Sequence, residues 1–177
     1  MQKNKNFKEL LNEVKAFVFD VDGVLSSDTI PLHPTDGPMR TVNIKDGYAL
    51  QLAVKKGYPI GIITGGDTES VQRRFQRLGI KDVYMKAPDK LPKLEDFMRI
   101  HNLSPENVLY MGDDIPDYRA MKIVGIPVCP IDAAPEIKEI SIYISQKKGG
   151  EGCARDVLEQ VLKVQGNWMN GNEAFGW

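Results

Sequence analysis

The sequence is poor in the residues that mark disulfide-stabilised or thiolate-metal proteins. Its two cysteines, Cys129 and Cys153, form no CxxC motif and no Cys/His cluster. Neither a disulfide framework nor a zinc site is therefore expected, and we interpret both as reduced, partly buried thiols of a cytoplasmic protein. The two histidines, His33 and His101, are isolated in the sequence, so we assign them to surface or packing roles.

The sequence also lacks a charge surplus and a long apolar run. It has 23 basic and 24 acidic residues and a net charge of −1, which gives no basis for a nucleic-acid or membrane-surface partner. No apolar stretch is long enough to cross a bilayer. The first 16 residues are polar, lack the apolar core of a signal peptide and predict a short amphipathic helix.

Apolar segments alternate with helical patterns along almost the whole chain. The length of 177 residues fits one domain, residues 1–177, with a full core. The opening strand starts at Phe17 and ends at the turn of Gly23. Further strands are predicted at residues 58–63, 82–85, 108–111, 126–129 and 142–144. Predicted helices start at Asp46 and Asp67 as caps, cover residues 89–101, 115–124 and 135–140, and start again near Gly152. This alternation predicts an α/β fold: a Rossmann-like three-layer α/β/α sandwich with a mostly parallel sheet.

Two segments interrupt the alternation. Residues 26–43 carry three prolines and a glycine between residues 29–30 and 40–43, which predicts a β-hairpin insertion with a proline-rich tip. The C-terminal tail, residues 165–177, contains Trp168, Phe175 and Trp177. Three large aromatic side chains indicate packing on the body or on a neighbouring subunit, and the alternative is a frayed end.

Four groups of polar residues follow successive predicted strands. They are Asp20 with Asp22, Thr64-Gly65-Gly66, Lys90, and Gly112-Asp113-Asp114 with Asp117. Each group alone could be a turn, a loop, a solvated lysine or a helix cap. Because the carboxyl ends of parallel strands meet at one edge of a sheet, the four groups together predict one shared crevice.

This set of side chains suits phosphoryl transfer. An aspartate can attack phosphorus and form an aspartyl-phosphate, which splits hydrolysis into two easier steps. Several carboxylate and carbonyl oxygens suit Mg²⁺, which offsets the repulsion between the two anions. A lysine and a hydroxyl can stabilise the phosphoryl oxygens. A second aspartate can protonate the leaving alcohol and then take a proton from water.

In this order, the motifs resemble the haloacid dehalogenase superfamily of aspartate-nucleophile phosphotransferases over residues 17–131. The resemblance implies that Asp20 is the nucleophile and a Mg²⁺ ligand. It implies that Asp22 is the general acid/base and that its backbone carbonyl is a ligand of the metal. Asp113 completes the metal site. The resemblance also implies that Thr64 and Lys90 bind the phosphoryl group. Asp114 or Asp117 would support the metal ligands without binding the metal.

The chain has no room for the cap domain of many superfamily members, since the only insertion after the first motif is the short hairpin of residues 26–43. It resembles the capless subclass, whose homotetramers let neighbouring subunits cover each site. The segment Asn43-Ile44-Lys45-Asp46-Gly47 and residues 149–157 resemble the 3-deoxy-D-manno-octulosonate 8-phosphate phosphatases of lipopolysaccharide precursor synthesis. This implies an acidic sugar phosphate bound by residues 43–47, Gly65, Arg74 and Lys90. It also implies that the glycine-rich segment with Arg155 comes from a neighbouring subunit, where Arg155 recognises the substrate carboxylate.

One position departs from that family. The octulosonate phosphatases commonly have arginine after the Thr/Ser-Gly pair of the second motif, where this chain has Gly66. A cationic contact is then either missing or supplied by Lys147, Lys148 or Arg155. The alternative substrates are nine-carbon keto-deoxy or acylneuraminate 9-phosphates. An alternative of another class is a receiver-like phosphoacceptor domain, although its phosphoacceptor lies on a middle strand, after a first acidic pair.

Overall fold

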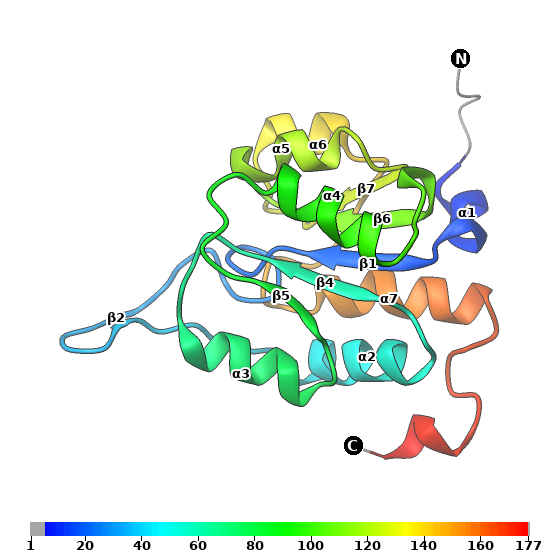
Figure 1. The fold of residues 1–177 in the computed structure, drawn as a ribbon, viewed down its shortest axis with the longest axis horizontal. Helices are drawn as coiled ribbons and strands as arrows, with labels where there is room; N and C mark the ends of the chain where they lie inside the picture. Colours follow the sequence, from blue (N-terminus) through cyan, green and yellow to red (C-terminus); the bar gives the residue numbers. More distant parts are fainter. Residues whose placement is uncertain (1–5, 177) are drawn as a thin grey trace.

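Six strands form one parallel sheet between two layers of helices in the computed structural model, which describes residues 6–176 (Figure 1). The strand order is β5-β4-β1-β6-β7-β8, and every neighbouring pair is parallel. The strands are β1 (Ala16–Phe19), β4 (Ile60–Ile63), β5 (Asp82–Tyr84), β6 (Val108–Met111), β7 (Ile126–Cys129) and β8 (Tyr143–Ile144). The predicted Rossmann-like α/β/α sandwich is confirmed.

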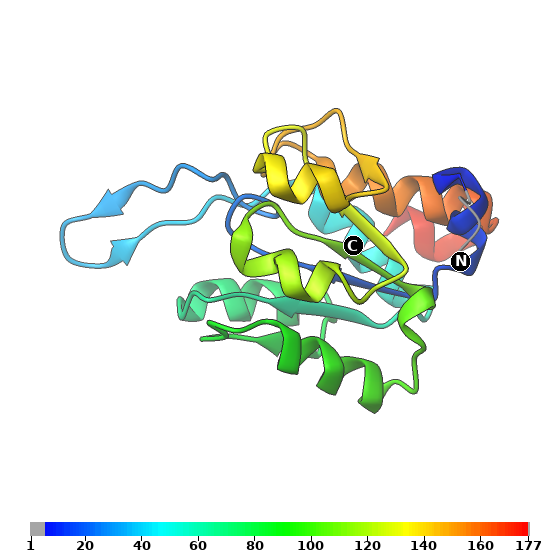
Figure 2. The ribbon, with the colours of Figure 1, turned by 90° about the horizontal axis from the view of Figure 1, so that it is seen from above.

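The helices divide between the two faces of the sheet (Figures 1 and 2). One layer contains α2 (Ile44–Lys55), α3 (Glu69–Arg77) and α7 (Cys153–Val164), with α1 (Phe7–Leu10) beside them. The other contains α4 (Leu91–Ile100), α5 (Tyr118–Met121) and α6 (Pro135–Ile140). Short 3-10 turns are η1 (Leu11–Glu13), η2 (Pro105–Asn107), η3 (Ile115–Asp117) and η4 (Asn172–Phe175). No helix among the described residues is long and apolar enough to cross a membrane.

The central strand β1 is buried on both faces. Phe17 and Phe19 pack into the core under α2 and α7, whereas Ala16 and Val18 pack into the core under α4 and α5. A strand buried on both faces needs apolar side chains at every position, which explains the continuous apolar run in the sequence. Because β1 ends at Phe19, the next residue, Asp20, lies at the carboxyl edge of the sheet.

Two predicted helix caps are wrong. The N-cap of α2 is Asn43, whose side chain accepts hydrogen bonds from the backbone N–H groups of Lys45 and Asp46. Asp46 instead lies in the first turn and accepts a hydrogen bond from the backbone N–H of Arg155, a contact that a local pattern cannot reveal. The N-cap position of α3 is Thr68, one residue after the predicted Asp67.

The predicted hairpin exists, but its arms pair at other residues. The antiparallel strands are β2 (Leu32–His33) and β3 (Gly37–Pro38), close to the tip, and the hairpin projects from the body (Figures 1 and 2). Predicted strands at residues 29–30 and 40–43 are not formed. The second arm turns to the body instead, because Arg40 pairs with Asp22 and the Asn43 side chain donates to the Gly150 carbonyl.

The C-terminal tail packs on the body of its own chain as far as the structure describes it. The Trp168 ring meets the Tyr48 ring edge-on, with 5.9 Å between centroids, and the Tyr48 hydroxyl donates to the Ala174 carbonyl. Phe175 is exposed. Trp177 and the first five residues, where part of the N-terminal helix was predicted, lie outside the described residues.

Candidate active site

A cavity of about 540 Å³ opens at the carboxyl edge of the sheet. Residues from all four predicted motifs line it: Asp20, Asp22, Thr64, Gly65, Lys90, Asp113, Asp114 and Asp117. Parallel strands bring these segments together because their carboxyl ends share one edge. Two charged residues that the sequence did not point to, Asp28 and Arg40, also line the cavity.

Lys90 is the buried cation of the cavity. Its Nζ lies 2.6 Å from Asp20 Oδ2 and 2.8 Å from Asp117 Oδ1, and its side chain is only 4% exposed. Burial alone would lower the pKa of Lys90, but attraction to Asp20 and Asp117 raises it above its ordinary value. The ammonium group therefore stays charged and is fixed beside Asp20.

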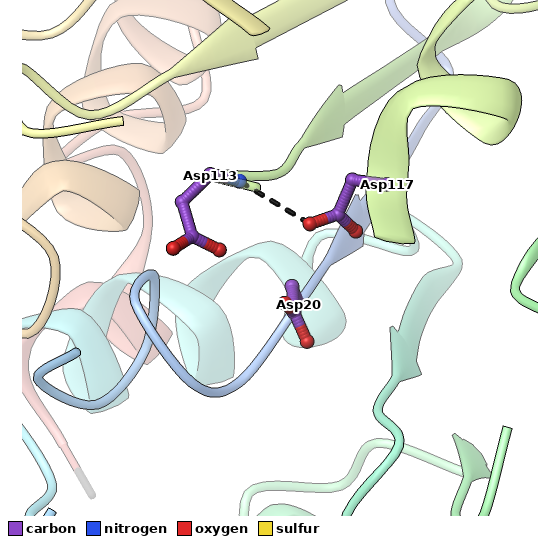
Figure 3. A group of neighbouring side chains, drawn as sticks. All are labelled: Asp20, Asp113 and Asp117. Atoms are coloured by element: carbon purple, nitrogen blue, oxygen red, sulfur yellow. Dashed lines mark hydrogen bonds between the residues drawn. The ribbon is translucent and has the colours of Figure 1, made fainter. Parts of the chain in front are cut away.

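Three carboxylates crowd around this one ammonium. Asp20, Asp113 and Asp117 come from different segments at the ends of β1 and β6, and each places an oxygen within 4.8 Å of the others (Figure 3). Burial and repulsion from Asp117 raise the pKa of Asp20 well above its ordinary value, against the attraction of Lys90. The same two causes raise the pKa of Asp113 to about 7. The site thus holds more buried negative charge than Lys90 balances.

This surplus of oxygen ligands fits a hard divalent cation. The Asp113 carboxylate lies directly against the backbone of Gly23, where a Cβ atom would be 1.9 Å from Asp113 Oδ2. Asp117 is already engaged, because Oδ1 accepts hydrogen bonds from Lys90 and Tyr110 while Oδ2 accepts one from the Asp113 backbone N–H. Asp20 accepts one hydrogen bond on each oxygen, from the Val21 backbone N–H and from Lys90. Asp20 and Asp113 thus keep more acceptor capacity for a cation than Asp117, which accepts three hydrogen bonds.

Thr64 forms the opposite wall of the cavity. It is buried at the end of β4, where its backbone N–H donates to the Tyr84 carbonyl at 3.0 Å. Its Oγ1 accepts a hydrogen bond from the Gly66 backbone N–H at 3.1 Å, which leaves the hydroxyl proton as a donor. This arrangement can bind an oxygen of a phosphoryl group.

Asp22 lies at the cavity mouth and pairs with Arg40. Arg40 Nε and Nη2 donate to the two carboxylate oxygens of Asp22 at 2.6 and 2.9 Å. Sequence reasoning missed Arg40 because it lies in the predicted hairpin arm, outside the polar groups that follow strands of the parallel sheet. Tyr110 was missed too, since a tyrosine within a buried strand gives no sign that its hydroxyl donates to Asp117.

Most of the residues predicted to bind the substrate do not line this cavity in a single chain. Asn43, Asp46, Gly47 and Arg74 surround a separate cavity of about 10 Å³, which is too small for a sugar. Arg155 lies in a third depression with Lys147 and Lys163. Of the predicted substrate-binding residues that the structure describes, Gly65 and Lys90 alone line the main cavity.

Residues 43–47 and 149–155 lie side by side, and we call this region the α2–α7 junction. The Asn43 side chain donates to the Gly150 carbonyl at 3.1 Å, and Asp46 Oδ1 accepts from the Arg155 backbone N–H at 2.7 Å. Gly149 packs on the loop that follows β1 in the same chain, where a Cβ atom would lie 2.1 Å from the Gly23 carbonyl oxygen. A Cβ atom on Gly150 would likewise lie 2.7 Å from the Ser27 backbone nitrogen, so Gly149 and Gly150 serve close packing within one chain.

The Arg155 side chain is held by its own chain. Its Nε donates to Glu159 at 2.9 Å, and its guanidinium lies 5.4 Å from the centroid of the Tyr48 ring and 4.8 Å from that of Trp168. Asp46 beneath it is buried, and burial raises its pKa to about 6 against the hydrogen bond from Arg155. Its Oδ2 atom has no hydrogen-bond partner.

Known proteins are similar to this chain in sequence and in fold. A model of the haloacid dehalogenase-like hydrolases matches residues 43–125. The 3-deoxy-D-manno-octulosonate 8-phosphate phosphatase KdsC of Escherichia coli K12 is 33% identical over 153 residues, which cover 86% of this chain and 81% of that protein.

Solved structures agree with this similarity. The phosphatase of the same name from Moraxella catarrhalis, in complex with a magnesium ion, a phosphate ion and KDO, has a TM-score of 0.86 and 31% identity. The alignment covers 91% of this chain and 92% of that one. The enzyme from Yersinia pestis has a TM-score of 0.87 and 29% identity, with 91% and 87% covered. The chain therefore belongs to the haloacid dehalogenase-like hydrolases and is a phosphoric monoester hydrolase.

Proposed function

We propose that the protein hydrolyses 3-deoxy-D-manno-octulosonate 8-phosphate to the free sugar acid and phosphate in lipopolysaccharide precursor synthesis. The observation that carries the proposal is Asp20, which lies 2.6 Å from the buried ammonium of Lys90 in a cavity rich in carboxylates. The KdsC relatives and the KDO-bound structure of the Moraxella catarrhalis enzyme support this substrate.

In the proposed mechanism, an Asp20 oxygen attacks phosphorus and forms an aspartyl-phosphate. The bond from phosphorus to the leaving oxygen breaks, its electron pair stays on that oxygen, and Asp22 supplies the proton. A water molecule then attacks phosphorus and gives a proton to Asp22. The bond between phosphorus and Asp20 breaks, which frees Asp20 and releases phosphate. Lys90 and Thr64 stabilise the phosphoryl oxygens in both steps.

The proposed metal is Mg²⁺, held by the carboxylates of Asp20 and Asp113 and the backbone carbonyl of Asp22. When bound, it would neutralise charge on the nucleophile and on the phosphoryl group. Asp117 and Asp114 would support these ligands from behind. The pKa of Asp113 near 7 shows how strongly the cluster resists negative charge without a cation.

We further propose a cytoplasmic homotetramer in which the sugar-recognition residues act between subunits. The hairpin would form an oligomer contact, since its Leu32, Met39 and Val42 are 79%, 52% and 50% exposed. Arg155 and the loop of residues 43–47 would then reach the cavity of a neighbour and bind the substrate carboxylate. Light scattering at micromolar concentration tests this, and a monomer would contradict it.

The substrate is tested by steady-state phosphate release with Mg²⁺ on the eight-carbon 8-phosphate and on a nine-carbon keto-deoxy 9-phosphate. A higher kcat/KM for the eight-carbon ester is expected. A preference for the nine-carbon ester would contradict the proposed substrate and make Gly66, in place of arginine, a determinant of specificity.

A further inference from the structure

All three guanidinium nitrogens of Arg40 donate hydrogen bonds to the protein beside the cavity. Nε and Nη2 donate to the two oxygens of Asp22, and Nη1 donates to Thr68 Oγ1 at 2.6 Å. The Arg40 side chain is 9% exposed, whereas that of Asp22 is 34% exposed. Both side chains line the cavity, and the guanidinium is the more buried and more firmly held partner.

The backbone around Arg40 is shaped to admit it. A Cβ atom on Gly66 would lie 3.0 Å from Arg40 Nη2 and 3.5 Å from Thr64 Oγ1, so any side chain at this position would crowd the guanidinium. Arg40 reaches this place from the hairpin, whose second arm leaves its partner strand to do so. The hairpin thereby delivers a side chain to the cavity of its own chain.

We propose that Arg40 is a positioning residue that fixes the carboxylate of Asp22 toward the leaving oxygen of the substrate. The proposal rests on the acid/base role given to Asp22 in the proposed function. A two-pronged pair between a planar guanidinium and a carboxylate sets both the position and the plane of the carboxylate. Each oxygen of Asp22 keeps a second lone pair, which can hold the proton that Asp22 gives to the leaving oxygen and can then accept a proton from water.

The contacts favour this role over that of a substrate receptor. Each guanidinium nitrogen already donates to Asp22 or Thr68, so an incoming anion would meet only the two remaining N–H groups, one on each Nη atom, beside a short charged pair. A misplacement of a catalytic group by about 1 Å costs roughly 10²-fold in rate. Loss of Arg40 should therefore lower the rate of the step that needs the proton rather than substrate affinity.

Leaving-group dependence tests the proposal. We compare Arg40→Met and Arg40→Lys with the unmodified enzyme on the sugar 8-phosphate, whose alcohol needs a proton to leave, and on p-nitrophenyl phosphate, whose phenolate does not. For Arg40→Met, kcat/KM should fall about 10²-fold on the sugar ester and less than about threefold on the aryl ester. A burst of p-nitrophenol should precede the steady state, because the later attack of water still needs Asp22. Arg40→Lys, which keeps the charge but not the fork, should recover part of the loss on the sugar ester.

Two other outcomes would overturn the proposal. An equal fall on both esters would indicate a structural role, and a higher KM with unchanged kcat would indicate a substrate receptor. Arg99→Met is the matched control, since it removes an exposed Arg–Asp pair on α4 and should leave both substrates unaffected.

Asp22→Asn separates this proposal from the proposed function. If Asp22→Asn shows the leaving-group dependence and Arg40→Met does not, the role of Arg40 fails while the function stands. If Asp22→Asn shows none, the acid/base role of Asp22 fails, and the role of Arg40 fails with it.

Discussion

The cavity and the α2–α7 junction are both built from charged side chains, but their charges are balanced differently. In the cavity, three carboxylates share one ammonium, and the pKa values of Asp20 and Asp113 are raised. In the junction, Arg155 has Glu159 and two aromatic rings as partners, and the Asn43 side chain caps a helix. The cavity is left to be neutralised by a ligand, whereas the junction is largely satisfied within the chain.

This difference separates the residues proposed for phosphoryl transfer from those proposed to recognise the sugar. The groups proposed for phosphoryl transfer all line one cavity of a single chain. Arg155 and residues 43–47, which we propose to recognise the sugar, lie outside this cavity, so in the proposed tetramer they act on the cavity of a neighbouring subunit. Four substitutions test this division.

The largest effect is expected for Asp20→Asn in the cavity. Removal of the nucleophile should lower kcat on the order of 10⁴-fold with every phosphate ester. The free energy of unfolding should not fall, because the neutral amide relieves the repulsion that raises the pKa of Asp20. Phosphate release and thermal unfolding measure the two effects, and substantial residual turnover would contradict the role of Asp20.

Lys90→Met should increase the excess of negative charge in the cavity. It leaves the buried carboxylates of Asp20 and Asp117 without their cation, which typically costs about 3–5 kcal/mol of folding free energy. Mg²⁺ should restore part of this loss, because a metal bound to the folded state alone stabilises it. Urea unfolding with and without Mg²⁺ measures both effects, and an equal loss in the two conditions would count against a metal at this site.

Asp46→Asn should stabilise the junction at alkaline pH. Burial raises the pKa of Asp46 from 3.8 to about 6, so its stability contribution is complete below the unfolded pKa and is lost as pH rises through about 6. Asparagine does not ionise, and the gain should reach about 3 kcal/mol near pH 8 and almost vanish near pH 4. Urea unfolding at the two pH values measures it. A gain that is equal at both would show that the carboxyl does not titrate in this range.

The smallest stability effect is expected for Arg155→Met. Its partly exposed contacts with Glu159, Tyr48 and Trp168 should contribute about 1 kcal/mol. KM for the keto-acid sugar phosphate should rise about tenfold, the cost of one lost contact to the carboxylate, while p-nitrophenyl phosphate is unaffected. Equal effects on both substrates would show that the junction takes no part in recognition.

The sequence predicted the sheet and the cavity because both depend on local patterns. Continuous apolar runs such as residues 16–19 identify buried strands, and polar residues directly after them must meet at one edge. Long-range contacts could not be predicted in this way. The local pattern assigned Asp46 as a helix cap. The hydrogen bond that it actually accepts comes from Arg155, 109 positions away, and no local pattern reveals it. Arg40 was missed because its partner, Asp22, lies across the hairpin.

The central claim is that Asp20 attacks phosphorus, and borohydride trapping tests it most directly. The enzyme is mixed with the sugar 8-phosphate and Mg²⁺ and quenched within one turnover. Borohydride then reduces an aspartyl-phosphate to homoserine, which mass spectrometry locates in the digested chain. We predict homoserine at the position of Asp20 and nowhere else. Reduction at Asp22, Asp113 or Asp117 instead, or none during active turnover, would contradict the account.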